Sequence, residues 1–442
     1  MKTRKKEKGI TLIALVISII VLLILAGVTI AALSGDNGIL TRAKEAKEKT
    51  EQAQKDEEQT LSNMENILES YRFENINTND TNPVRAMPSD ATILENDANK
   101  GIVIKDQNEN EWVWVEVPKT IVFADLTIDT AQELTEQNYN DIRDKLIEYV
   151  GVYRNGSATQ NRSDWKDEWY AMDGSTLITA DTENLTEQQK ALKNGCGLTY
   201  DEYISTYQKM LKSVYTYGGF WIGRYEAGIE GTTTETTNAR TSSSGRISIG
   251  TSPKAISKKD AIPYNYVYCS EAQALAQEMT PSNNYTSSLM FGIQWDLICK
   301  FLETRGGLKT ADINSDSSSW GNYNNARIEN IASGKYAIYR NASLDKWINI
   351  SDGYTKQNSE NDYRTLLSTG ITEYTNKMNI YDFAGNEWEW TLEKNLESNL
   401  ANTSRGGDYF SLGNMYSSSY RGAYNITYNS DGVSFRTTFY KK

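Results

Sequence analysis

Apolar residues are spread unevenly along the chain, and the longest apolar run lies near its N-terminus. Residues 10–33 carry no charged side chain and follow a basic leader at residues 1–9. As an α-helix this run spans roughly 36 Å at ~1.5 Å per residue, enough to cross a bilayer. A secretory signal peptide is the alternative, although its apolar core usually has about 7–15 residues. We predict a transmembrane helix at 10–33, with the leader in the cytoplasm and the rest outside.

The polar pattern after this run predicts a stalk and a linker. Residues 34–71 begin with turn formers and continue as a charged segment with a thin apolar stripe, which is typical of an exposed amphipathic helix. Residues 72–100 are polar, contain Pro83 and Pro88, and are predicted to be a linker. The globular domain is expected to cover residues 101–442.

The richest alternation of apolar and polar positions lies at residues 379–390. Tyr381 and Phe383 alternate with polar neighbours, as in a half-buried strand. Residues 384–386 read Ala-Gly-Asn, which favours a tight loop because Gly and Asn tolerate positive φ. Trp388 and Trp390 then share one face of the next strand, and the intervening glutamates face the other way.

Residues 119–216 separate the strands predicted at 111–118 and 219–226 and are far longer than a simple connection. Helical patterns occur at 132–150 and 199–214, around a polar middle that contains Trp165 and Trp169. We interpret this segment as an inserted subdomain or a surface elaboration.

Composition excludes several classes of function. The formal net charge of -12 argues against a nucleic-acid partner. The chain has no histidine, so Ser–His and Cys–His nucleophilic sites are ruled out. Its three cysteines show no C-x-x-C spacing, and buried idle thiols are favoured, although one pair could oxidise outside the cell.

Three motifs together resemble the formylglycine-generating-enzyme (sulfatase-modifying) family. They are N-x-Y-D-x-A-G-N-x-W-E-W at 379–390, R-G-G at 405–407 and G-x-x-F-R at 432–436. The resemblance implies a variant of the C-type-lectin fold with long insertions, so the expected fold class is α+β. The motif residues expected to form the structural frame are Trp388, Trp390, Arg405, Gly406, Gly407, Phe435 and Arg436.

The same resemblance bears on catalysis and metals. Oxidases of the family bind copper through cysteines after the R-G-G motif, and residues 408–420 contain none. We therefore expect no enzymatic activity, with an extracellular carboxylate-dependent enzyme as the alternative. The family's structural calcium site implies backbone ligands at Gly385 and Glu387 and side-chain ligands at Asn386 and Glu389. No other cofactor is expected.

The N-terminus resembles the prepilin signal of type IV pilins. In that family a prepilin peptidase cuts after the glycine, here Gly9, and methylates the new N-terminus, here Ile10. Pilins usually carry glutamate at the fifth mature position, where this chain has Ala14. A minor pilin or secretion pseudopilin that packs against other pilin subunits is therefore one hypothesis. We expect the protein on the extracellular face of a bacterial cell, either anchored in the membrane or associated with a pilus.

Residues 408–431 are rich in Tyr, Ser, Asn and Asp, the side chains that antibody loops use for recognition. This composition also resembles the variable region of diversity-generating-retroelement target proteins. We predict a surface protein that binds a protein or glycan ligand here, in the manner of an adhesin or receptor. The predicted contacts are Asp408, Tyr409, Phe410, Ser411, Asn414, Tyr416, Ser418, Tyr420, Tyr424, Asn425, Tyr428 and Asn429.

Overall fold

The computed structural model describes residues 12–34, 39–72, 76–155, 165–173, 176–179, 185–232, 253–351, 353–357, 364–395 and 400–442. The predicted processing site at Gly9 and Ile10 lies outside these residues. The chain divides into two compact units, Met1–Glu74 and Asn75–Lys442.

The first unit consists of α1 (Leu12–Ser34) and α2 (Ile39–Arg72). Over the parts of the chain that the structure describes, no helix combines the length and the apolar character that a membrane crossing requires. A bilayer core of about 30 Å demands about 20 consecutive apolar residues in a helix. The transmembrane helix predicted at 10–33 is therefore wrong. Helix α2 covers most of the segment predicted as a stalk, and Lys47 pairs with Glu51 one turn later at 3.6 Å.

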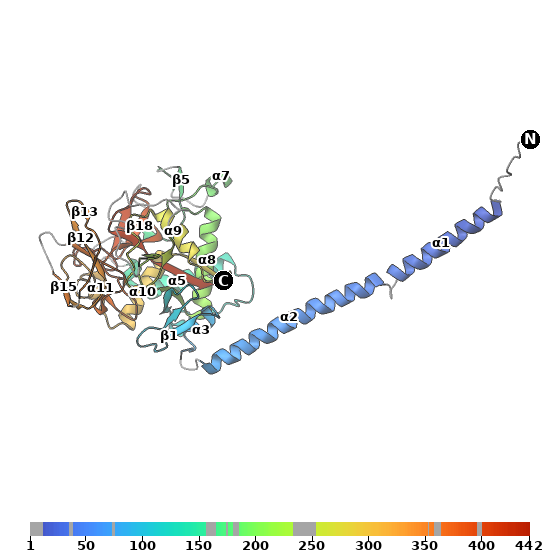
Figure 1. The fold of residues 1–442 in the computed structure, drawn as a ribbon, viewed down its shortest axis with the longest axis horizontal. Coiled ribbons are helices and arrows are strands. Elements are labelled where there is room, and N and C mark those ends of the chain that lie inside the picture. The colour runs from blue at the N-terminus through green and yellow to red at the C-terminus, as the bar shows by residue number, and fades with distance from the viewer. Residues whose placement is uncertain are drawn as a thin grey trace, which may run out of the picture. The chain divides into compact units, whose positions relative to one another are not determined.

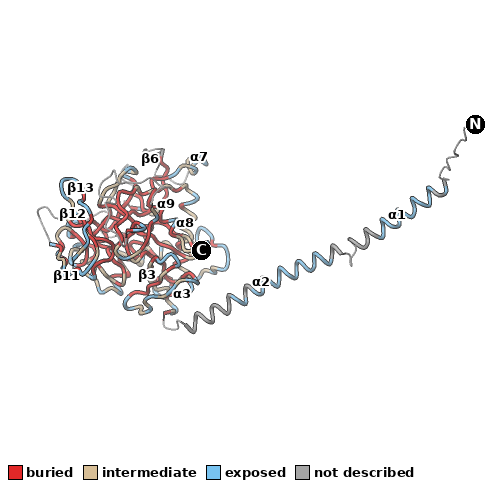
Figure 2. The backbone as a smooth tube through the Cα atoms, in the orientation of Figure 1, coloured by how far each residue is buried: buried red, intermediate tan, exposed pale blue. Residues whose placement is uncertain are grey.

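The second unit mixes helices with mostly antiparallel sheets (Figure 1), and its buried residues fill the interior (Figure 2). Its largest sheet has six antiparallel strands, and the inner strand β3 is buried along its centre because residues 112–115 are all apolar. In spatial order the strands are β1 (Thr92–Glu95), β2 (Val103–Lys105), β3 (Glu111–Glu116), β7 (Gly219–Gly223), β21 (Thr437–Lys441) and β10 (Tyr285–Leu289).

The segment predicted as a linker belongs largely to this unit. Residues 72–100 contain α3 (Pro83–Ala86) and β1, and β1 pairs with β2. Ile76 and Val84 are 3% and 1% exposed, and the Trp221 indole donates to the Ala86 carbonyl at 3.1 Å. The unit boundary therefore lies after residue 74 rather than after residue 100. The few apolar residues in this polar stretch become buried only when the six-stranded sheet, most of which comes from later in the chain, has formed.

A second sheet carries the C-terminal motifs. It is built around β17, whose two edges pair antiparallel with β18 and parallel with β20, and residues 388–394 of β17 are buried on both faces. Its strands are β19 (Arg421–Tyr424), β18 (Asn402–Arg405), β17 (Trp388–Asn395), β20 (Val433–Phe435) and, at the end of β17, β4 (Trp165–Lys166).

The strand predicted at Tyr381 and Phe383 is absent, and both residues lie in a buried loop. Asp382 explains the loop, because its carboxylate accepts from the Gly370 amide at 2.7 Å and the Thr375 hydroxyl at 2.8 Å. Its φ of 57° is also incompatible with an extended strand.

Smaller sheets complete the unit. They comprise β12 (Lys335–Arg340) with β13 (Ser343–Leu344), β14 (Ile348–Asn349) and β16 (Arg364–Leu367), and the pairs β11 (Ile328–Ile331) with β15 (Tyr354–Lys356), β5 (Ala171–Asp173) with β6 (Thr176–Thr179), and β8 (Gly228–Ile229) with β9 (Ala255–Ile256).

Helices pack around these sheets, and the two predicted within 119–216 correspond to α5 and α8. Helix α8 starts at a capping box between Thr199 and Glu202 and stops at Gly218, whose left-handed φ of 72° suits glycine. The helices are α4 (Lys119–Val122), α5 (Glu136–Val150), α6 (Val152–Asn155), α7 (Glu187–Lys190), α8 (Tyr200–Tyr217), α9 (Cys269–Glu278), α10 (Gly292–Thr304), α11 (Thr310–Asn314) and the 3-10 turn Glu373–Thr375.

Candidate functional site

Two tryptophans on β17 support the aromatic part of the candidate surface. Trp388 and Trp390 are two residues apart on one strand, so their side chains lie on the same face. Tyr416 and Tyr420 pack edge-on against Trp388 with ring centroids 5.7 and 6.0 Å away, and they are 5.0 Å from each other. Edge-to-face contacts of this kind add stability beyond the buried area.

Trp390 carries a second pair in the same way. The rings of Tyr424 and Tyr428 lie 5.8 and 6.3 Å from it and stack on each other at 4.1 Å. The Trp390 indole donates to the Val267 carbonyl at 2.9 Å, which fixes its orientation. Four tyrosines predicted to bind ligand therefore rest on two predicted frame residues.

The residues predicted as ligand contacts differ in exposure. Asp408 is 8% exposed, and Tyr409 and Ser418 are fully buried, so the structure corrects the prediction for these three. Tyr409 points inward because its hydroxyl donates to Asp431 at 2.5 Å. The remaining predicted contacts are exposed or half-buried: Phe410, Ser411, Asn414, Tyr416, Tyr420, Tyr424, Asn425, Tyr428 and Asn429.

Three exposed apolar side chains join this surface. Phe410, Leu412 and Met415 are 37%, 36% and 54% exposed. Phe410 packs edge-on against Tyr339 of β12 at 5.3 Å, with the Arg364 guanidinium over its ring. The sequence prediction omitted Leu412 and Met415, although apolar residues within an otherwise polar segment were a usable signal. We call Leu412, Met415 and the exposed or half-buried predicted contacts, which include Phe410, the recognition surface.

A buried cluster of ion pairs lies beneath the sheet that carries this surface. Arg405 donates to Asp296 at 2.8 Å and to Glu393 at 3.1 Å. Arg421 donates to the same carboxylates at 2.9 and 3.0 Å. All four side chains are completely buried. Mutual pairing is what makes such burial tolerable, because each lone charge would lose its hydration.

The inserted segment completes this cluster. Arg154 of α6 binds Asp296 at 2.9 Å, Glu393 at 2.7 Å and Asp167 at 2.8 Å. Asp167 in turn accepts from the first two backbone N–H groups of α10 at 2.6 and 2.8 Å. Burial alone would raise the pKa of Glu393, but the three guanidiniums outweigh it and lower the pKa to about 2. Arg154 and Asp167 of the inserted segment thus belong to the buried core of the unit.

The remaining frame residues hold the C-terminal strand. Arg436 pairs with Glu389 at 2.6 Å, and Phe435 is fully buried. Gly406 and Gly407 have φ of 98° and 76°, where a side chain would be strained. Glu389 was predicted to face away from the tryptophans, and it does so into the core rather than into solvent.

The residues at the predicted calcium site do not fit the ion. The Asn386 amide accepts from Asn322 at 2.8 Å and donates to Glu226 at 2.7 Å, so its oxygen is already used. Glu389 is neutralised by its arginine partner. Within the described residues no group of three or more acidic, histidine or cysteine side chains is arranged to hold a metal. Gly385 and Glu387 alone cannot supply the six or more oxygens that Ca²⁺ takes.

Glu387 is the one member of that loop with unused oxygens. Its side chain is 1% exposed, and its carboxylate oxygens make no hydrogen bond of good geometry, with the Ser434 and Asn265 side chains nearby partly opposing the rise in its pKa. Burial and the nearby Asp431 carboxylate raise the pKa of Glu387 well above its ordinary value. Burial likewise raises the pKa of Asp408 to about 7. Burial of this kind favours the neutral form of each acid.

Comparison with known proteins adds little. No protein-family model and no curated protein matches the sequence. Among solved structures the chain is similar to Treponema denticola variable protein 1, with 11% identity and a TM-score of 0.29, over 50% of this chain and 84% of that one. A likeness this low decides neither the fold nor the function.

Sequence reasoning identified Arg405 and Arg436 but did not pair them with Asp296, Glu393 and Glu389. Asp296 lies more than a hundred positions before Arg405 in the chain, and Arg154 lies in the insertion. The only available signal was indirect. Arginines in a strongly apolar frame need buried carboxylates as partners, but the sequence does not say which carboxylates these are.

Proposed function

We propose that this chain is a non-catalytic binding protein that recognises a protein or glycan through the recognition surface. The observation that supports the proposal most directly is the exposure of Phe410, Leu412 and Met415 beside four half-buried tyrosines. Exposed apolar and aromatic groups set among polar ones are typical of interaction sites.

The buried frame suits this role. Tyrosine offers a large contact area with few rotatable bonds, and rings already packed on Trp388 and Trp390 lose little entropy when a partner binds. The ion cluster below them fixes the strands from which these side chains project.

Burial of Glu387 and Glu389 favours binding over catalysis. Glu387 and Glu389 are each 1% exposed, so a substrate on the surface cannot reach them. We therefore do not propose the carboxylate-dependent enzyme that the sequence left open.

The finer proposal is that a retroelement diversifies this surface in a displayed bacterial protein. It rests on the composition of residues 408–431 and implies that substitutions between sister genomes concentrate at exposed positions. Codons for the buried Tyr409 and Ser418 are then expected to vary less than those for Asn414 and Asn425. Sequencing this gene and its neighbouring DNA in related isolates tests the point. Prepilin processing stays a prediction from the N-terminal sequence.

Binding itself is tested with the full chain on one array of extracellular bacterial and host proteins and one array of glycans. The double variant Phe410→Ser/Tyr428→Ser is expected to weaken any specific signal at least tenfold. The matched control is Tyr215→Phe, a tyrosine on α8 that bonds to the loop at residues 126–128. Signals that survive the double variant unchanged, or no signal on either array, contradict the proposal.

A further inference from the structure

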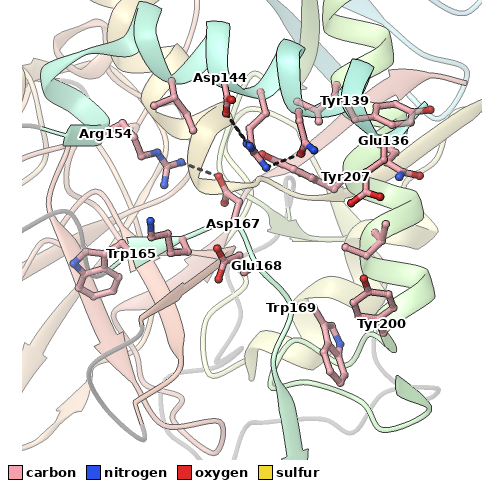
Figure 3. Close-up of a pocket in the computed structure, with 17 residues that line it drawn as sticks. Glu136, Tyr139, Asp144, Arg154, Trp165, Asp167, Glu168, Trp169, Tyr200 and Tyr207 are labelled. Carbon is pink, nitrogen blue, oxygen red and sulfur yellow. Dashed lines mark hydrogen bonds and ion pairs between the residues drawn. The ribbon is translucent and has the colours of Figure 1, made fainter. Parts of the chain in front are cut away.

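A separate pocket lies within the inserted segment. It encloses about 690 Å³ between α5, α8 and residues 165–169 (Figure 3). That volume is within the roughly 300–1,000 Å³ of small-molecule sites. None of its lining residues belongs to the recognition surface. The recognition surface contacts β12 through Phe410, and Figure 1 shows β12 and α8 at opposite sides of the unit.

Aromatic residues contribute to the wall. Tyr139, Tyr200 and Tyr207 are half-buried and present ring surface, whereas Trp165 and Trp169 are only 6% and 1% exposed. Figure 3 shows Trp165 at one end of the pocket and Tyr200 with Trp169 at the other. Trp169 is fixed by a 2.9 Å bond from its indole to the Leu198 carbonyl, and Tyr200 meets it edge-on at 5.7 Å. Tyr207 adds a half-buried ring that packs against Phe291, the residue before α10, at 4.8 Å. These rings are held rigidly before any ligand arrives.

Polar groups that both donate and accept lie between the rings. Gln208 and Asn140 present amides from the facing helices α8 and α5. Arg143 donates to the Asn140 carbonyl oxygen and to the Asp144 carboxylate, each at 2.9 Å. The pocket therefore offers donors and acceptors side by side rather than one kind alone.

The charges of the lining nearly cancel. Arg154 and Asp167 pair at 2.8 Å at the floor, and Arg154 is also bound to two carboxylates outside the pocket. Because Arg154 is already paired with three carboxylates, it cannot bind an anionic ligand. The four carboxylates (Glu136, Asp144, Asp167, Glu168) exceed the three cations (Arg143, Lys166, Arg154) by one.

We propose that this pocket binds an uncharged saccharide of one to three pyranose rings. A pyranose has an apolar C–H face that packs on aromatic rings, and its hydroxyl edge both donates and accepts hydrogen bonds. The half-buried tyrosine rings, the Asn140 and Gln208 amides and the nearly balanced charge match these properties together. The site is independent of the recognition surface and extends the protein's proposed binding role to a second ligand.

The test uses the full chain on an array that holds neutral, sulfated and sialylated glycans and immobilised amines. Hits are confirmed by calorimetry with the free neutral trisaccharide. Gln208→Ala is expected to weaken binding at least tenfold, and Ile204→Trp, which fills the pocket, to abolish it. Lys209→Ala, the next residue on α8 and outside the lining, is the matched control and is expected to bind as the parent does.

Thermal melting verifies that each variant is folded, and Phe410→Ser separates the two sites because it is expected to leave saccharide binding unchanged. Binding confined to anionic glycans or amines, equal binding by the Gln208 and Lys209 variants, or no binding to any neutral glycan overturns the proposal. Loss of saccharide binding in Phe410→Ser would assign the saccharide to the recognition surface and overturns it too.

Discussion

Arg405 and Arg421 lie directly opposite each other on the neighbouring strands β18 and β19, and both guanidiniums bind the carboxylate of Asp296. Like charges in this position repel each other. The pair is stable because Asp296 from α10 and Glu393 from β17 lie between the two cations. This relationship joins the sheet below the recognition surface to a helix from another part of the chain.

Removal of the shared carboxylate is expected to be costly. Asp296→Asn leaves three buried arginines with one fewer anion and should lower the free energy of unfolding by about 3–5 kcal/mol. Urea denaturation measures the change. Asp345→Asn is the control, because its pair with Arg340 is long at 3.7 Å and half-exposed, and surface pairs contribute at most about 1 kcal/mol. Equal effects of the two variants would show that the cluster does not stabilise the fold.

Glu387→Gln is expected to stabilise the protein as the pH rises. Because the folded pKa of Glu387 is raised above 4.5, the unfolded state binds fewer protons than the folded state between those two values. The parent therefore loses stability as pH increases through that window, by up to ~1.4 kcal/mol per pH unit, whereas glutamine does not titrate. The difference in free energy of unfolding between variant and parent should grow as the pH rises above about 4.5.

The exposed Glu278→Gln on α9 serves as the control for that series and should leave the pH dependence unchanged. A constant difference between Glu387→Gln and the parent across the pH range would contradict the prediction.

The buried Lys356 is expected to make the free energy of unfolding depend on pH with the opposite sign. Burial lowers its pKa to about 7 from 10.5, and its ammonium group contacts the backbone carbonyls of Tyr323 and Ala326. Between these values the unfolded state binds more protons, so this residue's contribution rises with pH and is lost as pH falls toward 7. Lys356→Met should flatten the stability profile between about pH 7 and 10, and the exposed Lys346→Met should not. Parallel profiles for both variants would exclude a neutral buried lysine.

Cys196 and Cys269 are expected to form a disulfide on oxidation. Their sulfur atoms are 3.1 Å apart, and both side chains are buried. Treatment with diamide removes one hydrogen from each thiol, forms the S–S bond and reduces the diamide to its hydrazine. The bond closes a loop of 73 positions and should stabilise the fold by roughly 2–4 kcal/mol.

Mass spectrometry of peptides identifies the cross-link. Cys299→Ser should still form it, and Cys196→Ser should not, since no other cysteine is available beside Cys269. A cross-link that contains Cys299 would be inconsistent with the structure.

Local patterns in the sequence were enough for the long helices and for the orientation of neighbouring side chains. The apolar periodicity at 132–150 and 199–214 predicted α5 and α8, and Thr199 marks a helix start through its own capping box. Alternation placed Trp388 and Trp390 on one face of β17. These features depend on residues within a few positions of each other, which is why they can be read without the fold.

Contacts between distant segments were beyond that reasoning. The segment predicted as a linker belongs to the second unit because the Trp221 indole, 135 positions further on, bonds to the Ala86 carbonyl, and Tyr409 lies inward with its hydroxyl bonded to Asp431. The apolar N-terminal run gave no membrane-spanning helix within the described residues.

Sequence by itself therefore determined the helical segments, the exclusion of histidine chemistry and the composition of the recognition surface. Only the tertiary structure decided which of those surface residues face solvent, which carboxylates neutralise Arg405 and Arg421, and that the insertion contains a pocket. The physical reason is that burial and charge pairing depend on which segments meet in space. Arg154 and Glu393 are 239 positions apart, yet they share a 2.7 Å hydrogen bond.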